Sequence, residues 1–92
     1  QELKGAVGEE NTFNGPSAVG VGWNGDIVVA DQGNHRIQFF SKDGLFLRSF
    51  GFKGHDLGRL YNPRGLALGP NGEIAVADYG NHRIVVAEFA ER

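Results

Sequence analysis

Two groups of acid, imidazole and guanidinium side chains recur at the same spacing in this 92-residue chain. They are Asp31, His35 and Arg36 in the first half, and Asp78, His82 and Arg83 in the second. An aspartate beside a histidine can orient the imidazole as a general base, and the same two side chains can bind zinc. A catalytic or metal site is rarely built twice, so we predict no catalytic residue and no metal ligand here. Both groups are instead expected to be structural, with turn-forming aspartates and strand-starting arginines that hold neighbouring units together.

The duplication extends well beyond these six residues. Residues 16–37 and 63–84 align at a constant offset of 47, and 13 of the 22 aligned positions are identical. Most of the others are conservative exchanges, such as Val19 with Leu66 and Val21 with Leu68. Such identity at one fixed period indicates two copies of a single structural unit.

Each copy has the pattern of short β-strands. In the first copy we expect strands at residues 18–21, 27–30, 36–40 and 45–50, separated by an Asn-Gly pair at 24–25 and by turn-forming residues at 31–34 and 41–44. No segment shows helical periodicity of useful length. Four short antiparallel strands in each period of about 45 residues are typical of a β-propeller blade, so the predicted fold class is all-β.

The composition excludes several functional classes. The hydrophobic fraction of 40% is that of a globular protein. The absence of cysteine excludes disulfides, thiolate metal sites and cysteine nucleophiles. Its net charge of −2 argues against a strongly basic nucleic-acid-binding domain. No apolar run approaches the ~20 residues that a membrane span needs, so we expect no membrane partner.

Three motifs of the second copy carry a resemblance to a known repeat. They are NPRGLA at residues 62–67, NGEIAVAD at 71–78 and GNHRI at 80–84, and the first copy diverges slightly at 14–19. Over residues 5–90 the chain resembles two consecutive NHL repeats, closest to those of TRIM-NHL proteins. The resemblance implies part of a six-bladed, non-catalytic propeller that recognises protein or RNA, with ubiquitin transfer located in a separate domain. For a chain derived from a TRIM-NHL protein, it also implies a cytoplasmic location.

An enzymatic alternative stays open because some NHL-like propellers are lyases or hydrolases with a metal at the central channel. The duplicated, structural pattern of the histidines and aspartates argues against this alternative. We therefore expect no cofactor and no enzymatic activity.

Two blades leave two large apolar faces in need of partners. We expect a first blade at residues 1–50, with an N-terminal strand stub, and a second at 51–92 that lacks its outer strand. Three copies would supply six blades, and each stub would pair with the last blade of the neighbouring chain. The sequence therefore predicts either a cyclic homotrimer or a place within a longer chain.

The segment that crosses between the copies carries the best candidate binding residues. Residues 51–65 hold three basic side chains against Asp56, a local charge of +2. An aromatic ring, an amide and a cation within four residues suit a single-stranded RNA base with its phosphate. Tyr79 lies in the turn that is expected at the same end of the molecule. The candidates are Lys53, Arg59, Tyr61, Asn62, Arg64 and Tyr79.

The equivalent segment of the first copy weakens the RNA prediction. Residues 5–18 contain Glu9 and Glu10 and no basic residue, a local charge of −2. Because RNA affinity grows with each neutralised phosphate, alternating charge fits a protein or peptide partner at least as well. We place a protein or peptide partner slightly ahead of RNA.

Two other features were considered as sites. Trp23 occupies the Asn-Gly turn where the second copy has Pro70, and an indole there is a plausible partner anchor at the opposite end of the blade. Residues 51–58 are rich in glycine, but they lack the Gly-Lys-Ser/Thr ending of a phosphate-binding loop, and no helix follows.

Overall fold

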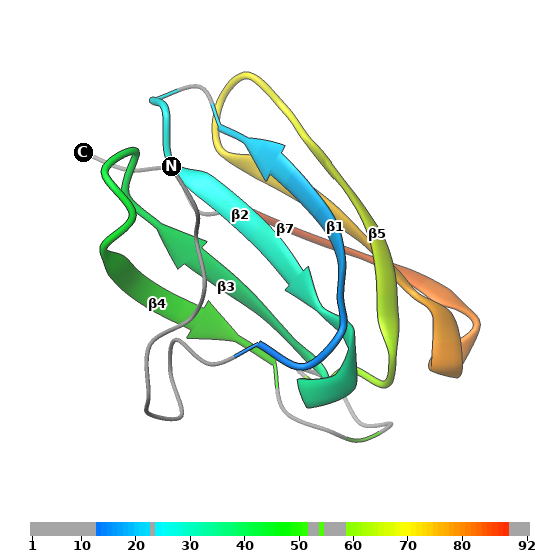
Figure 1. Cartoon of the computed structure of the whole chain (residues 1–92). Coiled ribbons are helices and arrows are strands. Elements are labelled where there is room, and N and C mark those ends of the chain that lie inside the picture. Colours follow the sequence, from blue (N-terminus) through cyan, green and yellow to red (C-terminus); the bar gives the residue numbers. More distant parts are fainter. Residues whose placement is uncertain (1–12, 23, 52–53, 55–58, 89–92) are drawn as a thin grey trace.

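The computed structural model of the chain describes residues 13–22, 24–51, 54 and 59–88. They form two antiparallel sheets (Figure 1). The first has the order β1-β2-β3-β4, with strands Pro16–Val21, Ile27–Asp31, Arg36–Phe40 and Phe46–Phe50. The second has the order β5-β6-β7, with strands Pro63–Leu68, Glu73–Asp78 and Arg83–Glu88. The predicted all-β class and two blade-like sheets are thereby confirmed.

Short 3₁₀ turns lie at the equivalent corner of each sheet. They are η1 (Gln32–Asn34), between β2 and β3, and η2 (Tyr79–Asn81), between β6 and β7. The sequence predicted turn residues at both places, because Gly-Asn pairs favour chain reversal. No helix in the described residues is long and apolar enough to cross a membrane.

The strand register sorts the side chains onto two faces of each sheet. Directly paired residues share a face, so Val19 lies with Val29, while Ala18 lies with Ala30 and Ile37. We call the face that carries Val19 and Val21 in the first sheet, and Leu66 and Leu68 in the second, the leading face. The opposite side of each sheet is the trailing face.

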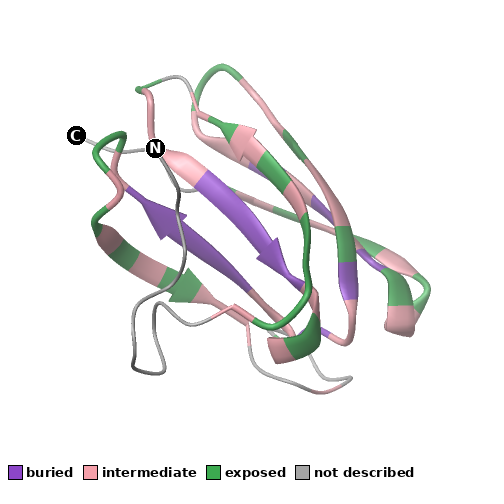
Figure 2. Ribbon diagram, in the orientation of Figure 1, coloured by how far each residue is buried: buried purple, intermediate pink, exposed green. Residues whose placement is uncertain are grey.

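The core lies between the trailing face of the first sheet and the leading face of the second. Its buried members come from strands of both sheets and from the crossing segment; they are Val28, Ala30, Ile37, Phe39, Leu60, Ile74 and Val76. Figure 2 shows these buried positions running along the middle strands. Fully burying one such side chain contributes about 1.5–3 kcal/mol, which makes this contact the main link between the sheets.

The inner strands β1 and β5 pack closely in this interface because the first sheet has a glycine at the point of contact. A Cβ on Gly20 would lie 3.0 Å from Cδ1 of both Leu66 and Leu68. The Oγ of Ser17 also donates a hydrogen bond to the Pro63 carbonyl at 3.0 Å. The alternation of small and large residues therefore fixes how one blade sits on the next.

Candidate functional site

A buried aspartate at the end of the middle strand organises one end of each sheet. Asp78 is fully buried, and it accepts hydrogen bonds from Tyr61 N at 2.7 Å, from Asn81 Nδ2 at 2.8 Å and from Arg83 Nε at 3.0 Å. Such charge-assisted bonds satisfy the carboxylate after it leaves water. The Asp78 carboxylate therefore connects the residue before β5, the turn η2 and strand β7 of one blade.

Asp31 makes the equivalent contacts in the first sheet. It accepts bonds from Asn14 N at 2.8 Å, Asn34 Nδ2 at 3.0 Å, Arg36 Nε at 3.1 Å and also Gln38 Nε2 at 2.8 Å. These contacts lie within one blade, whereas the sequence interpretation had both groups holding neighbouring units together. The reason is that Asn14 lies just before β1, the first strand of the same sheet, as Tyr61 lies just before β5.

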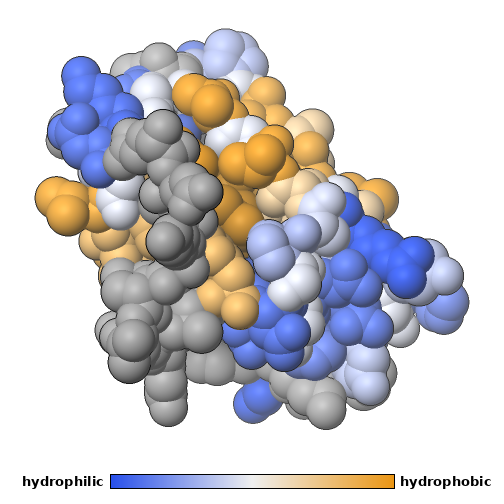
Figure 3. Space-filling model, in the orientation of Figure 1, coloured by the Kyte–Doolittle hydropathy of each residue, from blue (hydrophilic) through white to orange (hydrophobic). Residues whose placement is uncertain are grey.

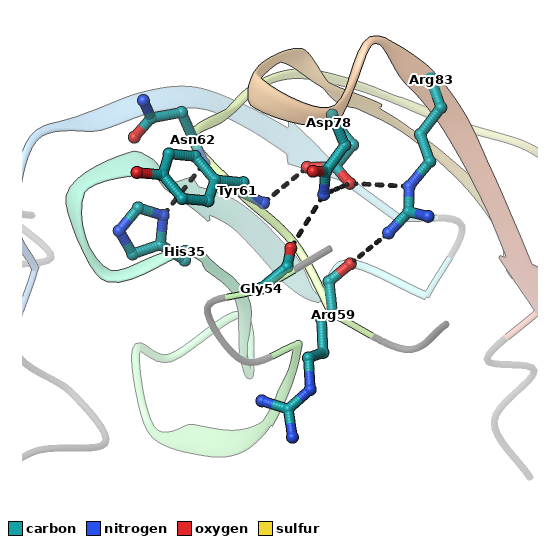
Figure 4. Close-up of polar contacts among 8 residues, drawn as sticks. His35, Gly54, Arg59, Tyr61, Asn62, Asp78 and Arg83 are labelled. Atoms are coloured by element: carbon teal, nitrogen blue, oxygen red, sulfur yellow. Dashed lines mark hydrogen bonds and ion pairs between the residues drawn. The ribbon is translucent and has the colours of Figure 1, made fainter. Parts of the chain in front are cut away.

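His35 is the member of its group that reaches the other blade. Its backbone is in the left-handed region at φ 58°, where η1 ends. Its ring contacts the residues that precede β5. Its Nδ1 accepts a hydrogen bond from Asn62 N at 3.0 Å, and its ring packs on Tyr61 with centroids 5.0 Å apart. Figure 4 shows these two contacts side by side.

The described part of the crossing segment is fixed against η2 and β7. Asn81 Nδ2 donates to the Gly54 carbonyl at 2.9 Å, and Arg83 Nη2 donates to the Arg59 carbonyl at 2.8 Å (Figure 4). We call the region formed by η1, η2 and residues 54 and 59–64 the loop end. The sequence expectation that the crossing segment and both turns share one end of the molecule agrees with these contacts.

The most accessible candidate group at the loop end is a cation on an aromatic ring. The Arg64 Cζ lies 4.0 Å from the centroid of Tyr79, and the tyrosine is 53% exposed. Arg64 is exposed at the start of β5, one residue after Pro63. A guanidinium stacked on an exposed ring is held in one orientation while its edge stays available to a ligand.

The other predicted binding residues are placed differently. Tyr61 and Asn62 are half-buried and take part in the contact with His35. Arg59 is exposed, and its carbonyl accepts the bond from Arg83. Lys53 and Trp23 lie outside the described residues.

The sequence analysis missed the amide side chains that complete the aspartate contacts. These residues are Asn34, Gln38 and Asn81. The repeated Gly-Asn-His-Arg-Ile motif contained the signal for the two asparagines. Gln38 has no counterpart in the second copy, where Val85 occupies the position, so repetition gave no indication of its role.

A small space lies between the sheets at the end opposite the loop end. It holds about 30 Å³ and is bordered by Asp26, Arg48 and Glu73 among other residues. The backbone N–H of Asn71 donates to Glu73 Oε1 and holds the pKa of that carboxyl below its ordinary value. The space has room for only a few water molecules. Within the described residues, no three histidine, cysteine or acidic side chains gather as a metal site.

The comparisons with known proteins agree with the repeat architecture. Residues 13–40 and 60–87 each match the family model of the NHL repeat. The chain is 60% identical over 37 residues to the B-box type zinc finger protein ncl-1 of Caenorhabditis elegans, which covers 40% of this chain and 4% of that relative. It is 46% identical over 54 residues to Protein brain tumor of Drosophila melanogaster, which covers 59% of this chain and 5% of that relative.

Proposed function

Because this chain belongs to the NHL repeat family, we propose that it is a non-catalytic β-propeller scaffold whose loop end binds a protein or peptide partner. The observation that carries the proposal is the exposed Arg64–Tyr79 pair. It offers a flat aromatic surface and a fixed cation, which suit an acidic or carbonyl-rich segment of a partner. The TRIM-NHL resemblance of the sequence supports a recognition role, although the chain spans only about a twentieth of the two relatives.

Two further arginines near the loop end are already paired with carboxylates of the chain, which favours a peptide over RNA. Arg36 and Arg83 are paired with the buried carboxylates of Asp31 and Asp78 at 3.1 and 3.0 Å. Their charge is therefore largely neutralised before any ligand arrives. A surface that follows an RNA backbone needs several available cations, because each neutralised phosphate adds affinity.

Single-stranded RNA is the second candidate, and the same pair favours it. An exposed tyrosine beside a guanidinium can stack one base and contact its phosphate. Such a site would read one or two nucleotides rather than a long tract. The enzymatic alternative gains no support from Asp31 or Asp78, since both carboxylates are occupied by donors of the chain itself.

The propeller context completes the proposal. Blades of this kind work within a closed ring, so we propose that the two sheets supply two of six blades, either in three copies of the chain or in one longer chain. The predicted pairing of the N-terminal stub falls on residues 1–4, outside the described residues.

The loop-end proposal is tested by selection with two probes. Wild-type chain is used to select from a random-sequence peptide library and from a random-sequence single-stranded RNA library at low and high salt. Arg64→Ala and Tyr79→Ala should each weaken the selected peptides about tenfold, the size of a lost cation–aromatic contact plus one polar bond. Lys42→Ala is the matched control, because it removes an exposed cation from the turn between β3 and β4.

The outcomes separate the candidates. Peptides that lose affinity with both loop-end variants, but not with the control, support the proposal. Selection of RNA alone, with affinity that falls steeply with salt and with Arg64→Ala, would establish the second candidate instead. The loop-end site would be overturned if neither library yields a ligand, or if the selected ligands bind both variants as tightly as the wild type.

A further inference from the structure

We propose that a second copy of this chain docks on the first, with the leading face of its first sheet on the trailing face of the other copy's second sheet. The contact continues the interface that already joins the two sheets within one chain. The inference rests on the blade architecture of the proposed function and does not depend on the loop-end ligand. It identifies which residues meet, and therefore which changes separate the copies.

Each partner surface has an exposed apolar row on its edge strand, whereas Val29, Gln38 and Phe40, farther into the leading face of the first sheet, are buried. Val19 and Val21 on the leading face of the first sheet are 66% and 68% exposed. Ile84 and Val86 on the trailing face of the second sheet are 66% and 71% exposed. Figure 3 shows apolar side chains gathered over the region where Figure 1 places β1. Isolated exposed apolar residues are ordinary, but adjacent ones on a single sheet face indicate an interaction surface.

The repeat relates each open surface to one that is already buried. Val19 and Val21 align with Leu66 and Leu68, which pack on the first sheet. Likewise, Ile84 and Val86 align with Ile37 and Phe39, which are buried in the core. The two open faces of one chain are thus the two halves of the interface that is formed once inside it.

The sizes of the residues compensate at the closest point. Inside the chain, Leu66 and Leu68 pack over Gly20, where an added Cβ would have only 3.0 Å. The residue equivalent to Gly20 is the exposed Ala67, and smaller valines stand in place of the two leucines. One methyl is gained on the trailing face, and a methylene is lost from each facing side chain. Volume-conserving exchanges of this kind are tolerated best in packed interfaces.

A hollow on the leading face is placed to receive Ile84. It has a volume of about 350 Å³ and is lined by Phe13, Pro16, Ser17, Ala18, Val19 and Val29. The aligned surface of the second sheet contains Leu60 and Val76, which enclose Ile37 in the core. Phe13 aligns with Leu60 and packs on Phe40 with centroids 5.5 Å apart. Ile84, the counterpart of Ile37, would enter this hollow in the docked copy.

A polar contact at the loop end is also present in duplicate. Within the chain, His35 Nδ1 accepts a hydrogen bond from the backbone of Asn62, which has φ 55°. The equivalent residues are His82 at φ 55° and Gly15 at φ 68°, so both halves have the required backbone conformation. His82 lies beside the second sheet and Gly15 precedes β1 of the first sheet, so in the proposed docking His82 of one copy meets Gly15 of the other. The hydrogen bond would set the register of docking.

Head-to-tail contact of this kind leaves one open face at each end of a chain of copies. A heterologous interface either closes into a ring or grows without limit. Three copies supply six blades, the number that the sequence resemblance implies for a closed ring. Closure would bury every leading and trailing face, so we expect association to stop at the trimer.

The test uses two charge insertions at exposed positions, one on each face. Val19→Glu places a charge on the leading face of the first sheet, and Val86→Glu places one on the trailing face of the second sheet. Neither residue belongs to the core. We expect wild-type chain to sediment with the mass of three copies and each variant alone with the mass of one. An equimolar mixture should form a dimer, because the trailing face of Val19→Glu and the leading face of Val86→Glu are both intact. Formation of that dimer also shows that both variants are folded.

Controls and contrary outcomes are distinct from those for the loop end. Leu45→Glu, in the turn between β3 and β4, introduces the same charge at a residue that is 69% exposed and should leave the trimer unchanged. His82→Ala should weaken association about fivefold to tenfold, as expected for one lost hydrogen bond. A wild-type chain that remains monomeric at high concentration would overturn the inference, as would a mixture without dimer. Library selection on the same samples would still report the loop-end site separately.

Discussion

At the scale of single residues, the buried aspartates are the most consequential groups in the structure. Asp78 is fully buried and accepts from Tyr61 N, Asn81 Nδ2 and Arg83 Nε. Asp78→Ala would remove the shared acceptor of these three bonds in a place that water reaches poorly, although Asn81 Nδ2 keeps its bond to the Gly54 carbonyl. Because unpaired buried polar groups are costly, we expect a loss of about 2–4 kcal/mol in the free energy of unfolding. Urea denaturation at a fixed chain concentration measures this loss.

The two copies provide an internal comparison for this prediction. Asp31 has the additional buried donor Gln38 Nε2 at 2.8 Å, so Asp31→Ala should cost about 1 kcal/mol more than Asp78→Ala. Glu88→Ala, an exposed carboxylate at the end of β7, should change stability by less than about 0.5 kcal/mol. Equal losses at Asp31, Asp78 and Glu88 would show that the buried contacts carry no special weight.

Repetition in the sequence predicted that the Asp-His-Arg groups differ from a catalytic site, but it could not divide the roles within each group. The aspartates and arginines act within a blade, and His35 contacts Asn62 of the next. That division depends on the left-handed backbone at His35, where φ is 58°. Such a conformation is uncommon for a residue other than glycine, although histidine adopts it more often than most residues.

At the scale of elements, the 3₁₀ turns determine where the loop end forms. Gly80 N donates to the Tyr61 carbonyl at 2.7 Å, which brings the strand entry against η2. A Cβ at Gly80 would lie 2.5 Å from that same carbonyl oxygen and from Tyr61 Cδ1. Gly80→Ala should therefore separate η2 from the entry to β5 and cost about 1–3 kcal/mol, as for other overpacking changes.

The matched control is a glycine with room for a methyl group. A Cβ on Gly22 would meet nothing closer than 3.6 Å, so Gly22→Ala should be near neutral in thermal denaturation. The backbone amide of residue 80 should lose hydrogen-exchange protection in Gly80→Ala relative to the β6 amides, because its hydrogen bond to the Tyr61 carbonyl is lost. Unchanged protection together with unchanged stability would contradict the proposed close approach.

The strands themselves were largely predictable because their residues alternate or form short apolar runs between turn signals. The predicted strand at residues 36–40 matches β3, and the one at 45–50 differs from β4 by a single residue. What the sequence could not supply was the contact between strands far apart, such as β1 with β5. That contact depends on the fit of Gly20 against two leucines, which no local pattern contains.

At the scale of the whole molecule, the Arg64–Tyr79 pair is distinct from the exposed rows on β1 and β7. The core joins one trailing face to one leading face and leaves exposed apolar rows on β1 and β7, while the Arg64–Tyr79 pair lies at the loop end of the second sheet. A ligand at the loop end and a docked copy are therefore compatible. In the proposed docking, the repeat that makes the blades alike also makes the chain complementary to itself.

Self-docking has a thermodynamic consequence that can be measured without any ligand. Folded chains that associate are stabilised by mass action, so the melting temperature must rise with chain concentration. For a trimer, each tenfold increase adds about 0.9 kcal/mol per chain, which corresponds to about 4–7 °C for a domain of this size. Val86→Glu should melt at one temperature over the same range, whereas Leu45→Glu should follow the wild type. A wild-type melting temperature that does not change with concentration would mean that the open faces are not covered by copies of this chain.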